Sequence, residues 1–115
     1  MIRPGQIYTA DFGPAGPHPV IIVSREELNR GRYVFVVPCT SSRFPARSKL
    51  PSCVPFQPGE FGFTVDCVAQ CENIFSIDKE QIDFSSGPRG TLDSPAFRRI
   101  VKAIGHVIQS KCEPQ

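Results

Sequence analysis

The sequence of 115 residues lacks the features that mark membrane, secreted and metal-binding proteins. No apolar run approaches the roughly 20 residues that a helix needs to cross a bilayer, and the first residues carry no apolar stretch typical of a signal peptide. The five cysteines include no Cys-x-x-Cys pair, and the two histidines are remote from each other in the sequence. We therefore expect a cytoplasmic protein without membrane association, disulfide framework, metal site or other cofactor.

A strong charge of one sign is also missing, because the net charge is only +2. Its distribution is more informative, since the stretch from Leu28 to Gly59 contains no acidic residue. Such a stretch could follow a phosphate backbone, or it could be a solvated loop whose charges maintain solubility. The five basic residues of the stretch are Arg30, Arg32, Arg43, Arg47 and Lys49.

Proline and glycine are abundant, with 12 and 9 residues, and they favour short elements joined by turns over a bundle of helices. Runs rich in β-branched and aromatic residues predict a series of strands. The length is near the commonest domain size, so we expect one domain over residues 1–115. The expected strands cover residues 6–11, 19–24, 33–40, 52–56 and 64–77, with 52–56 at a sheet edge because it contains a proline, and with a basic loop over 41–51.

One helix is expected near the end of the sequence. Asp93 or Ser94 would cap its first turn, where Pro95 is well tolerated. Apolar residues at helical spacing would then form a stripe that packs on the sheet or on another subunit. These elements predict a mainly β, small α+β fold in which a twisted antiparallel sheet is partly closed into a barrel. The stripe consists of Phe97, Ile100, Val101, Ile104, Val107 and Ile108.

Polar side chains stand at the ends of two of the expected strands. His18 directly precedes one strand, and Thr40, Ser41 and Ser42 end another. An imidazole exchanges protons near neutral pH, and hydroxyl groups donate hydrogen bonds. Because basic residues follow directly, this arrangement indicates a site for an anionic ligand.

Five short strings of the sequence match those of a known family. Residues 4–8, PGQIY, with Asp11 and Phe12 are similar to RGDIYWVDF; residues 18–24, HPVIIVS, to RPVLVVS; residues 36–41, VVPCTS, to VVPITS and VPCT; residues 71–79, CENIFSIDK, to CEQIRTIDK; and Leu92 with Asp93 to the start of LSDEEM. No one string is diagnostic, but five in the right order and spacing make a specific match. The chain thus resembles, over nearly its whole length, the MazF/PemK family of toxins from bacterial toxin–antitoxin systems.

The resemblance implies an SH3-like barrel of the CcdB/MazF type that assembles as a homodimer. It implies a toxin that is a metal-independent endoribonuclease, which cleaves single-stranded RNA, mainly mRNA, and so inhibits translation. The RNA 2′-hydroxyl would attack the adjacent phosphorus and leave a cyclic phosphate and a 5′-hydroxyl end. A small cognate antitoxin would wrap the dimer and block the site.

The resemblance also implies roles for individual residues. The cleavage needs a base, an acid and donors for the phosphoryl oxygens, and Thr40 matches the family's catalytic Thr or Ser. His18 stands in place of the family's arginine, and Glu72 keeps an acid of the PemK branch. We expect His18 and Glu72 to be the acid–base pair and Thr40 the third catalytic residue. The expected RNA-binding residues are Ser41, Ser42, Arg43, Arg47, Lys49 and Gln70.

Three departures from the family pattern keep other functions open. His18 lacks the permanent charge of arginine, Phe75 replaces another arginine, and the loop over 13–17 is shorter than the family's loop that closes over RNA. One alternative is a catalytically weak or inactive relative that binds RNA or antitoxin. A CcdB-like gyrase poison is less favoured, because the ending over 109–115 lacks the Trp-Gly-Ile sequence of that class.

Overall fold

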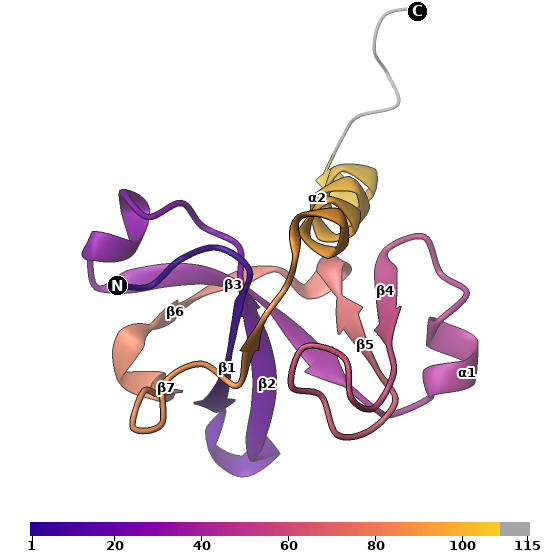
Figure 1. The fold of residues 1–115 in the computed structure, drawn as a ribbon, viewed down its shortest axis with the longest axis horizontal. Coiled ribbons are helices and arrows are strands. Elements are labelled where there is room, and N and C mark those ends of the chain that lie inside the picture. Colours follow the sequence, from indigo (N-terminus) through magenta and orange to yellow (C-terminus); the bar gives the residue numbers. More distant parts are fainter. Residues whose placement is uncertain (109–115) are drawn as a thin grey trace, which may run out of the picture.

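The computed structural model describes residues 1–108, in which a twisted antiparallel sheet is packed beside one long helix (Figure 1). Cys112 and the ending over 109–115 therefore lie outside the described residues. The expected mainly β fold with a C-terminal helix is confirmed. The strands are β1 (Gln6–Asp11), β2 (Pro17–Ile22), β3 (Tyr33–Thr40), β4 (Cys53–Phe56), β5 (Cys67–Gln70), β6 (Phe75–Asp78), β7 (Ile82–Asp83) and β8 (Gly90–Thr91), and the helices are α1 (Phe44–Arg47) and α2 (Ser94–Ile108).

The strand order is β4-β5-β3-β2-β1-β7, and all of these pairs are antiparallel. Each of two long strands pairs with two shorter strands along one of its edges. Strand β3 pairs with both β5 and β6, and β1 pairs with both β7 and β8. This sharing twists the sheet strongly. The end strands β4 and β7 do not pair with each other within the described part of the chain, so the barrel is open.

The expected single strand over 64–77 is wrong, because a 3-10 turn at Cys71–Asn73 divides it into β5 and β6. The reason is the register on β3. Cys39 pairs with Ala69 and Val36 with Phe75, so a step of three residues along β3 corresponds to six residues of its partner. The turn accommodates the three extra residues, and the chain bends away from the sheet at this point.

Side-chain alternation along the central strands builds two cores on opposite faces of the sheet. Ile7, Ile21 and Val37 face the core beneath α2, which also contains Ile100 of that helix. The residues next to them in sequence face a second core beside β6 and β7, to which Phe12 and Phe75 are peripheral. The second core consists of Tyr8, Ala10, Val20, Ile22, Val34, Val36, Ile77 and Ile82.

Helix α2 begins as the sequence predicts. The backbone N–H of Ala96 donates to Oδ1 of Asp93 at 2.9 Å, which satisfies a free amide of the first turn. The expected apolar stripe is only partly buried: Ile100 is fully buried, whereas Val101 is 52 % exposed and Ile108 is 66 % exposed. The helix therefore covers the first core with one side of the stripe and leaves the other side open.

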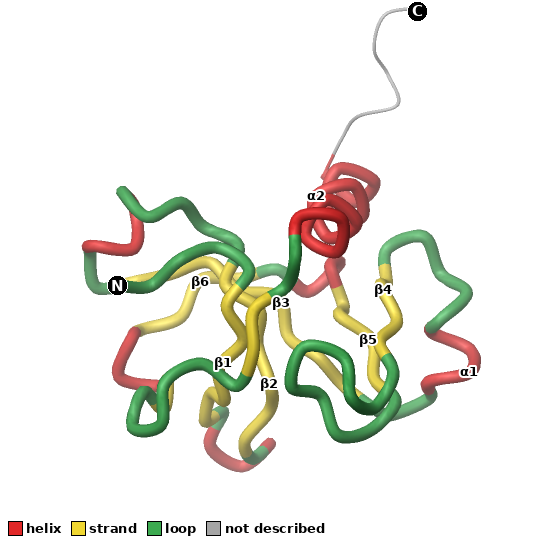
Figure 2. The backbone as a smooth tube through the Cα atoms, in the orientation of Figure 1, coloured by secondary structure: helices red, strands yellow, loops and turns green. Residues whose placement is uncertain are grey.

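The connections are mostly loops, as Figure 2 shows. The basic segment over 41–51 is not all loop, because it contains the single turn of α1. The short edge strand is confirmed as β4, and its Pro55 directs no N–H into the ladder. No helix within residues 1–108 is both long and apolar enough to span a bilayer.

Candidate functional site

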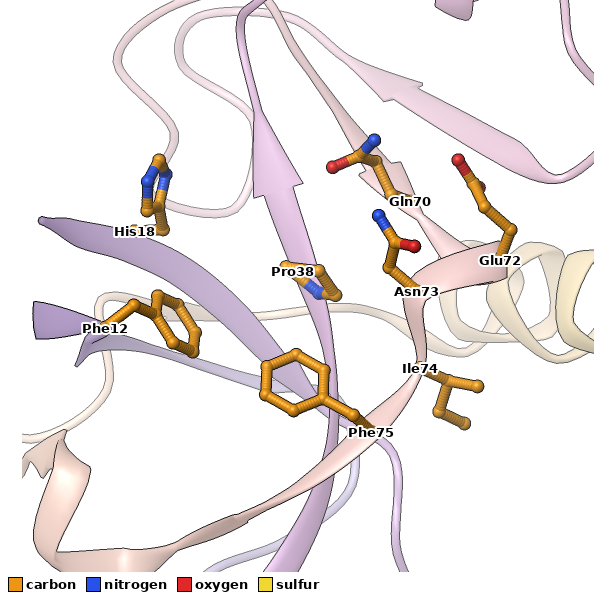
Figure 3. A pocket seen from close by; sticks show the side chains of 8 residues that line it. All are labelled: Phe12, His18, Pro38, Gln70, Glu72, Asn73, Ile74 and Phe75. Atoms are coloured by element: carbon orange, nitrogen blue, oxygen red, sulfur yellow. The ribbon is translucent and has the colours of Figure 1, made fainter. Parts of the chain in front are cut away.

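An open pocket of about 530 Å³ lies where β5 turns away from β3. Figure 3 shows the lining residues, which come from the β1–β2 connection, from β2, β3 and β5, from the turn between β5 and β6 and from the start of β6. The pocket therefore exists because β6 and β5 diverge along the same edge of β3. It is lined by Phe12, His18, Pro38, Gln70, Glu72, Asn73, Ile74 and Phe75.

His18 and Thr40 lie on the same face of the sheet. Val20 of β2 pairs with Pro38 of β3. His18 lies two residues before Val20, and Thr40 lies two residues after Pro38. Because the strands are antiparallel, both residues lie at the same end of the sheet. Both side chains are half-buried. Pro38 and His18 line the pocket, whereas Thr40 lies just beyond its lining. The expected pairing of an imidazole and a hydroxyl at neighbouring strand ends therefore agrees with the backbone register.

The loop between β1 and β2 holds the His18 ring. The imidazole Nε2 lies 3.1 Å from the carbonyl oxygen of Ala15. A carbonyl only accepts, so Nε2 carries the proton of this hydrogen bond and Nδ1 is the nitrogen left to exchange a proton. Gly16 closes the loop by donating its N–H to the carbonyl of Gly13 at 2.8 Å, and its φ of 81° and ψ of −175° suit glycine alone.

Glu72 lies on the other side of the pocket from His18, with the amides of Gln70 and Asn73 between them (Figure 3). Its side chain is exposed to solvent, and Oε1 accepts from the Sγ of Cys53 at 3.7 Å. Burial and the adjacent Glu72 carboxylate raise the pKa of the Cys53 thiol. The thiol therefore remains protonated. It donates a hydrogen bond to Glu72 and does not place a second negative charge beside this carboxylate.

The hydroxyl group of Thr40 stabilises the turn that follows β3. Its Oγ1 accepts from the backbone N–H of Ser42 at 3.1 Å. Ser41 and Ser42 are exposed, and Nη1 of Arg47 donates to the Ser42 carbonyl at 3.1 Å. The strand end is thus connected directly to the basic segment.

The expected basic residues lie on and around α1, outside the pocket. Arg43 precedes the helix in the left-handed backbone region, with φ of 54° and ψ of 37°, and is exposed. Lys49 is exposed, and Arg47 lies close enough to Cys53 to lower the pKa of its thiol slightly against the larger effects of burial. These basic residues lie beyond the end of β3, where the chain continues into α1.

Five side chains of the pocket are not among the expected site residues: Phe12, Pro38, Asn73, Ile74 and Phe75. The last three reach the pocket because of the turn at 71–73, for which the alternating sequence gives no signal. Phe12 and Pro38 belong to strings that carry the family resemblance, but the sequence gives no signal that they line a pocket.

Cys39 directly precedes Thr40 but is not a nucleophile. Its side chain is 1 % exposed, and burial raises the pKa of the thiol well above its ordinary value. A protonated buried thiol behaves as a small apolar side chain.

The family model described as PemK-like, MazF-like toxin of type II toxin-antitoxin system matches residues 3–108. The chain belongs to this family. The match covers all five of the strings on which the resemblance was based, and it includes His18, Thr40 and Glu72.

Individual relatives agree with the family assignment. The Endoribonuclease EndoA of Bacillus subtilis (strain 168) is 27 % identical over 88 residues, which cover 71 % of this chain and 75 % of that protein. A solved endoribonuclease in complex with its cognate antitoxin, from a mycobacterial species, has a TM-score of 0.76 at 24 % identity and covers 93 % of this chain and 94 % of its own. The Mycobacterium tuberculosis toxin MazF-mt6 has a TM-score of 0.74 at 23 % identity and covers 89 % and 94 %. At these identities the two structures establish the fold.

Proposed function

We propose that this PemK/MazF-family toxin is a metal-independent endoribonuclease that cleaves single-stranded RNA and thereby inhibits translation. The observation that carries the proposal is the pocket beside β3, where an imidazole and a carboxylate stand on opposite sides of a space large enough for a nucleotide. The relatives named endoribonucleases support it. Since mRNA is the expected substrate, the cytoplasm is the expected compartment.

The proposed chemistry needs an acid and a base on opposite sides of one phosphorus. The 2′-hydroxyl loses its proton to Glu72, and the 2′-oxygen forms a bond to phosphorus. The bond from phosphorus to the 5′-oxygen breaks, and His18, which must enter this step as the imidazolium with a proton on each ring nitrogen, delivers the proton of Nδ1 to that oxygen and becomes neutral. The products are a 2′,3′-cyclic phosphate and a 5′-hydroxyl end.

The remaining expected residues hold the substrate. Thr40, Ser41 and Ser42 would donate hydrogen bonds to the phosphoryl oxygens, on which charge gathers in the transition state. Gln70 would contact the RNA from within the pocket, next to Glu72. The basic residues around α1 would attract the RNA backbone and raise the association rate; they are Arg43, Arg47 and Lys49.

The proposed assembly is a homodimer that a cognate antitoxin inhibits. An apolar groove of about 610 Å³ runs between α2 and the sheet and includes Phe35, Val101 and Ile108. Exposed apolar surface of this kind supports burial against a second copy of the chain. The solved relative in complex with its cognate antitoxin supports the second partner.

One assay separates the proposed function from its alternatives. The purified protein is incubated with a long single-stranded RNA in EDTA, and the ends of the fragments are identified. Fragments with 5′-hydroxyl ends support the proposal, and His18→Ala should then abolish cleavage without unfolding the protein. Intact RNA at a large excess of protein would reject it in favour of an inactive binding relative. Inhibition of DNA supercoiling without loss of RNA would favour the gyrase-poison alternative.

A further inference from the structure

We infer that a groove between α2 and the edge strand β4 binds backbone phosphates of the RNA segment on the 5′ side of the scissile bond, through Arg99, Lys102 and His106. The inference rests on the proposed function and deepens it, because it gives the direction in which the RNA crosses the protein. These three residues are not among the expected RNA-binding residues.

The first observation is the charge of this groove, which has a volume of about 390 Å³. Arg99, Lys102 and His106 follow one another at steps of three and four residues, which places them on one side of the helix. All three are exposed, and no acidic residue of the described chain lines the groove. Neither Arg99 nor Lys102 forms an ion pair within residues 1–108. The groove therefore offers positive charge to an anionic ligand.

The second observation is that packing holds Arg99 in place. Its guanidinium carbon lies 5.6 Å from the ring centroid of Phe56, which is fully buried beneath it. The contact keeps the side chain against β4, while its N–H groups remain exposed to solvent. A guanidinium that is already positioned loses little freedom on binding, and it can contact one phosphate through two parallel hydrogen bonds.

The third observation is that the groove adjoins the proposed catalytic pocket on the side of Glu72. Cys53 lines the groove, and its Sγ donates to Oε1 of Glu72 at 3.7 Å. Figure 3 shows α2, the pale yellow helix, on the side of Glu72 that is away from His18, and α2 contacts the turn at 71–73. One RNA strand can therefore pass from the pocket into the groove.

The proposed chemistry gives this strand a direction. Glu72 takes the proton of the 2′-hydroxyl, which belongs to the nucleotide on the 5′ side of the scissile phosphate. His18 protonates the 5′-oxygen of the nucleotide on the 3′ side. Because the groove lies beside Glu72 and across the pocket from His18, it receives the phosphates that precede the cut.

Two features favour RNA over a protein at this groove. A peptide strand that adds to β4 would meet Pro55, which has no N–H, so the edge offers an incomplete set of ladder hydrogen bonds. A second copy of the chain is expected at the apolar groove that includes Val101 and Ile108. That groove shares no lining residue with the basic one, which the proposed dimer therefore leaves open.

The test is the binding of a short, labelled single-stranded RNA in which fluorine replaces each 2′-hydroxyl, so that the strand cannot be cleaved. Fluorescence anisotropy measures the affinity over a range of salt concentrations. Arg99→Gln and Lys102→Gln should each reduce the slope of log affinity against log salt by roughly 0.7, the value for one phosphate contact to a single strand. Arg98→Gln is the matched control, because Arg98 is exposed on the same helix but does not line the groove.

Equal slopes for Arg99→Gln, Lys102→Gln and Arg98→Gln would overturn the inference. A glutamate oligomer of the same charge that binds as tightly as the RNA, and with the same dependence on Arg99 and Lys102, would also overturn it and assign the groove to an acidic peptide.

A spin label on one end of the same RNA tests the direction. A label at the 5′ end should broaden the amide NMR signals around Lys102, and a label at the 3′ end those of the loop over 13–17. The reverse order, or equal broadening from both ends, would overturn the inference. No readout requires cleavage: intact RNA in the EDTA assay with the expected slopes would reject the nuclease and keep the groove, and cleavage with unchanged slopes would do the reverse.

Discussion

The carbonyl oxygen of Ala15 lies 3.1 Å from Nε2 of His18, and this contact leaves Nδ1 as the ring nitrogen that can exchange a proton. The carbonyl belongs to the loop over 13–17, for which the family resemblance implies a shortened form. We therefore expect the loop to have a role of its own, which is to orient the imidazole of His18. A backbone group performs this role, so its effect depends on loop geometry and not on a side chain.

Gly16→Ala should lower the rate of RNA cleavage at least tenfold. Gly16 adopts a backbone conformation that is essentially restricted to glycine, and an alanine there costs roughly 1–3 kcal/mol. An added methyl group meets no atom within 4 Å, so the loop relaxes without a steric clash and the Ala15 carbonyl moves. The measurement is single-turnover cleavage, together with the ¹⁵N NMR signals of the His18 ring, which report the tautomer directly.

Gly59→Ala is the control, because Gly59 also has a positive φ, of 94°, and an added Cβ there meets no atom within 4 Å, but Gly59 lies in the connection between β4 and β5. If both variants slowed cleavage equally and left the ring signals unchanged, the loop would not orient His18.

The salt dependence of RNA binding tests the basic segment. If Arg43 and Lys49 each contact a phosphate, replacing either one by glutamine should reduce the slope of log affinity against log salt by roughly 0.7, the value for one contact to a single strand. Both residues are exposed, so the fold should not change. Arg98→Gln, an exposed change on α2, provides the comparison and should leave the slope as it is. Unchanged slopes for Arg43→Gln and Lys49→Gln would remove the segment from the RNA path.

The strands that the sequence predicts well are those whose two faces both pack against a core. Strand β3 packs Val34 and Val36 against one core and Val37 and Cys39 against the other, and its apolar pattern predicts the strand over 33–40. The segment 64–77 carries the same pattern, yet it is divided in two. Cys71 continues the alternation and is buried although it lies in the turn. The division depends on how this segment shares the edge of β3, and such pairing between distant segments leaves no trace in a local pattern.

Prediction of the site from the sequence is limited in the same way. The resemblance pointed to His18 and Glu72, and both line one pocket. Thr40 is on the expected face but outside the lining, because the pocket extends towards β6 and not towards α1. Asn73 reaches the pocket only through the turn that the sequence did not predict.

Introducing a charge at the open side of α2 should separate the proposed dimer. Val101 is 52 % exposed in the monomer and lines the groove beside α2, so Val101→Asp leaves the fold intact but would bury an unpaired carboxylate between two copies. An unpaired buried charge costs roughly 3–5 kcal/mol, which corresponds to a dissociation constant at least 100-fold higher. Sedimentation velocity over a range of concentrations measures the change.

Val65→Asp matches this variant closely, because Val65 is 54 % exposed and is not part of the groove. The two proteins should have similar melting temperatures, and only Val101→Asp should dissociate. A dimer that resists Val101→Asp would place the interface on another face.

Acid stability should depend on Asp78, which joins the end of β6 to the segment before β3. The backbone N–H of Glu80 donates to Oδ1 at 2.9 Å and Nε of Arg32 donates to Oδ2 at 2.7 Å, and together they lower the pKa of the Asp78 carboxyl in the folded protein. Because the folded pKa lies below the unfolded one, the carboxylate stabilises the fold above the unfolded pKa. This stabilisation is lost as the pH falls through the folded value.

The melting temperature of Asp78→Asn should therefore be lower than that of the unaltered protein at neutral pH, and the two should converge in acid. Thermal unfolding followed by circular dichroism between about pH 2 and pH 7 covers the window in which aspartates titrate. Asp66→Asn removes an exposed carboxylate that makes no hydrogen bond within residues 1–108. It should leave the difference in melting temperature between acid and neutral pH the same as in the unaltered protein. If Asp78→Asn and the unaltered protein lost stability in parallel over the whole range, the two hydrogen bonds to Asp78 would contribute nothing to the acid sensitivity, and the junction between β6 and β3 would depend on its apolar packing alone.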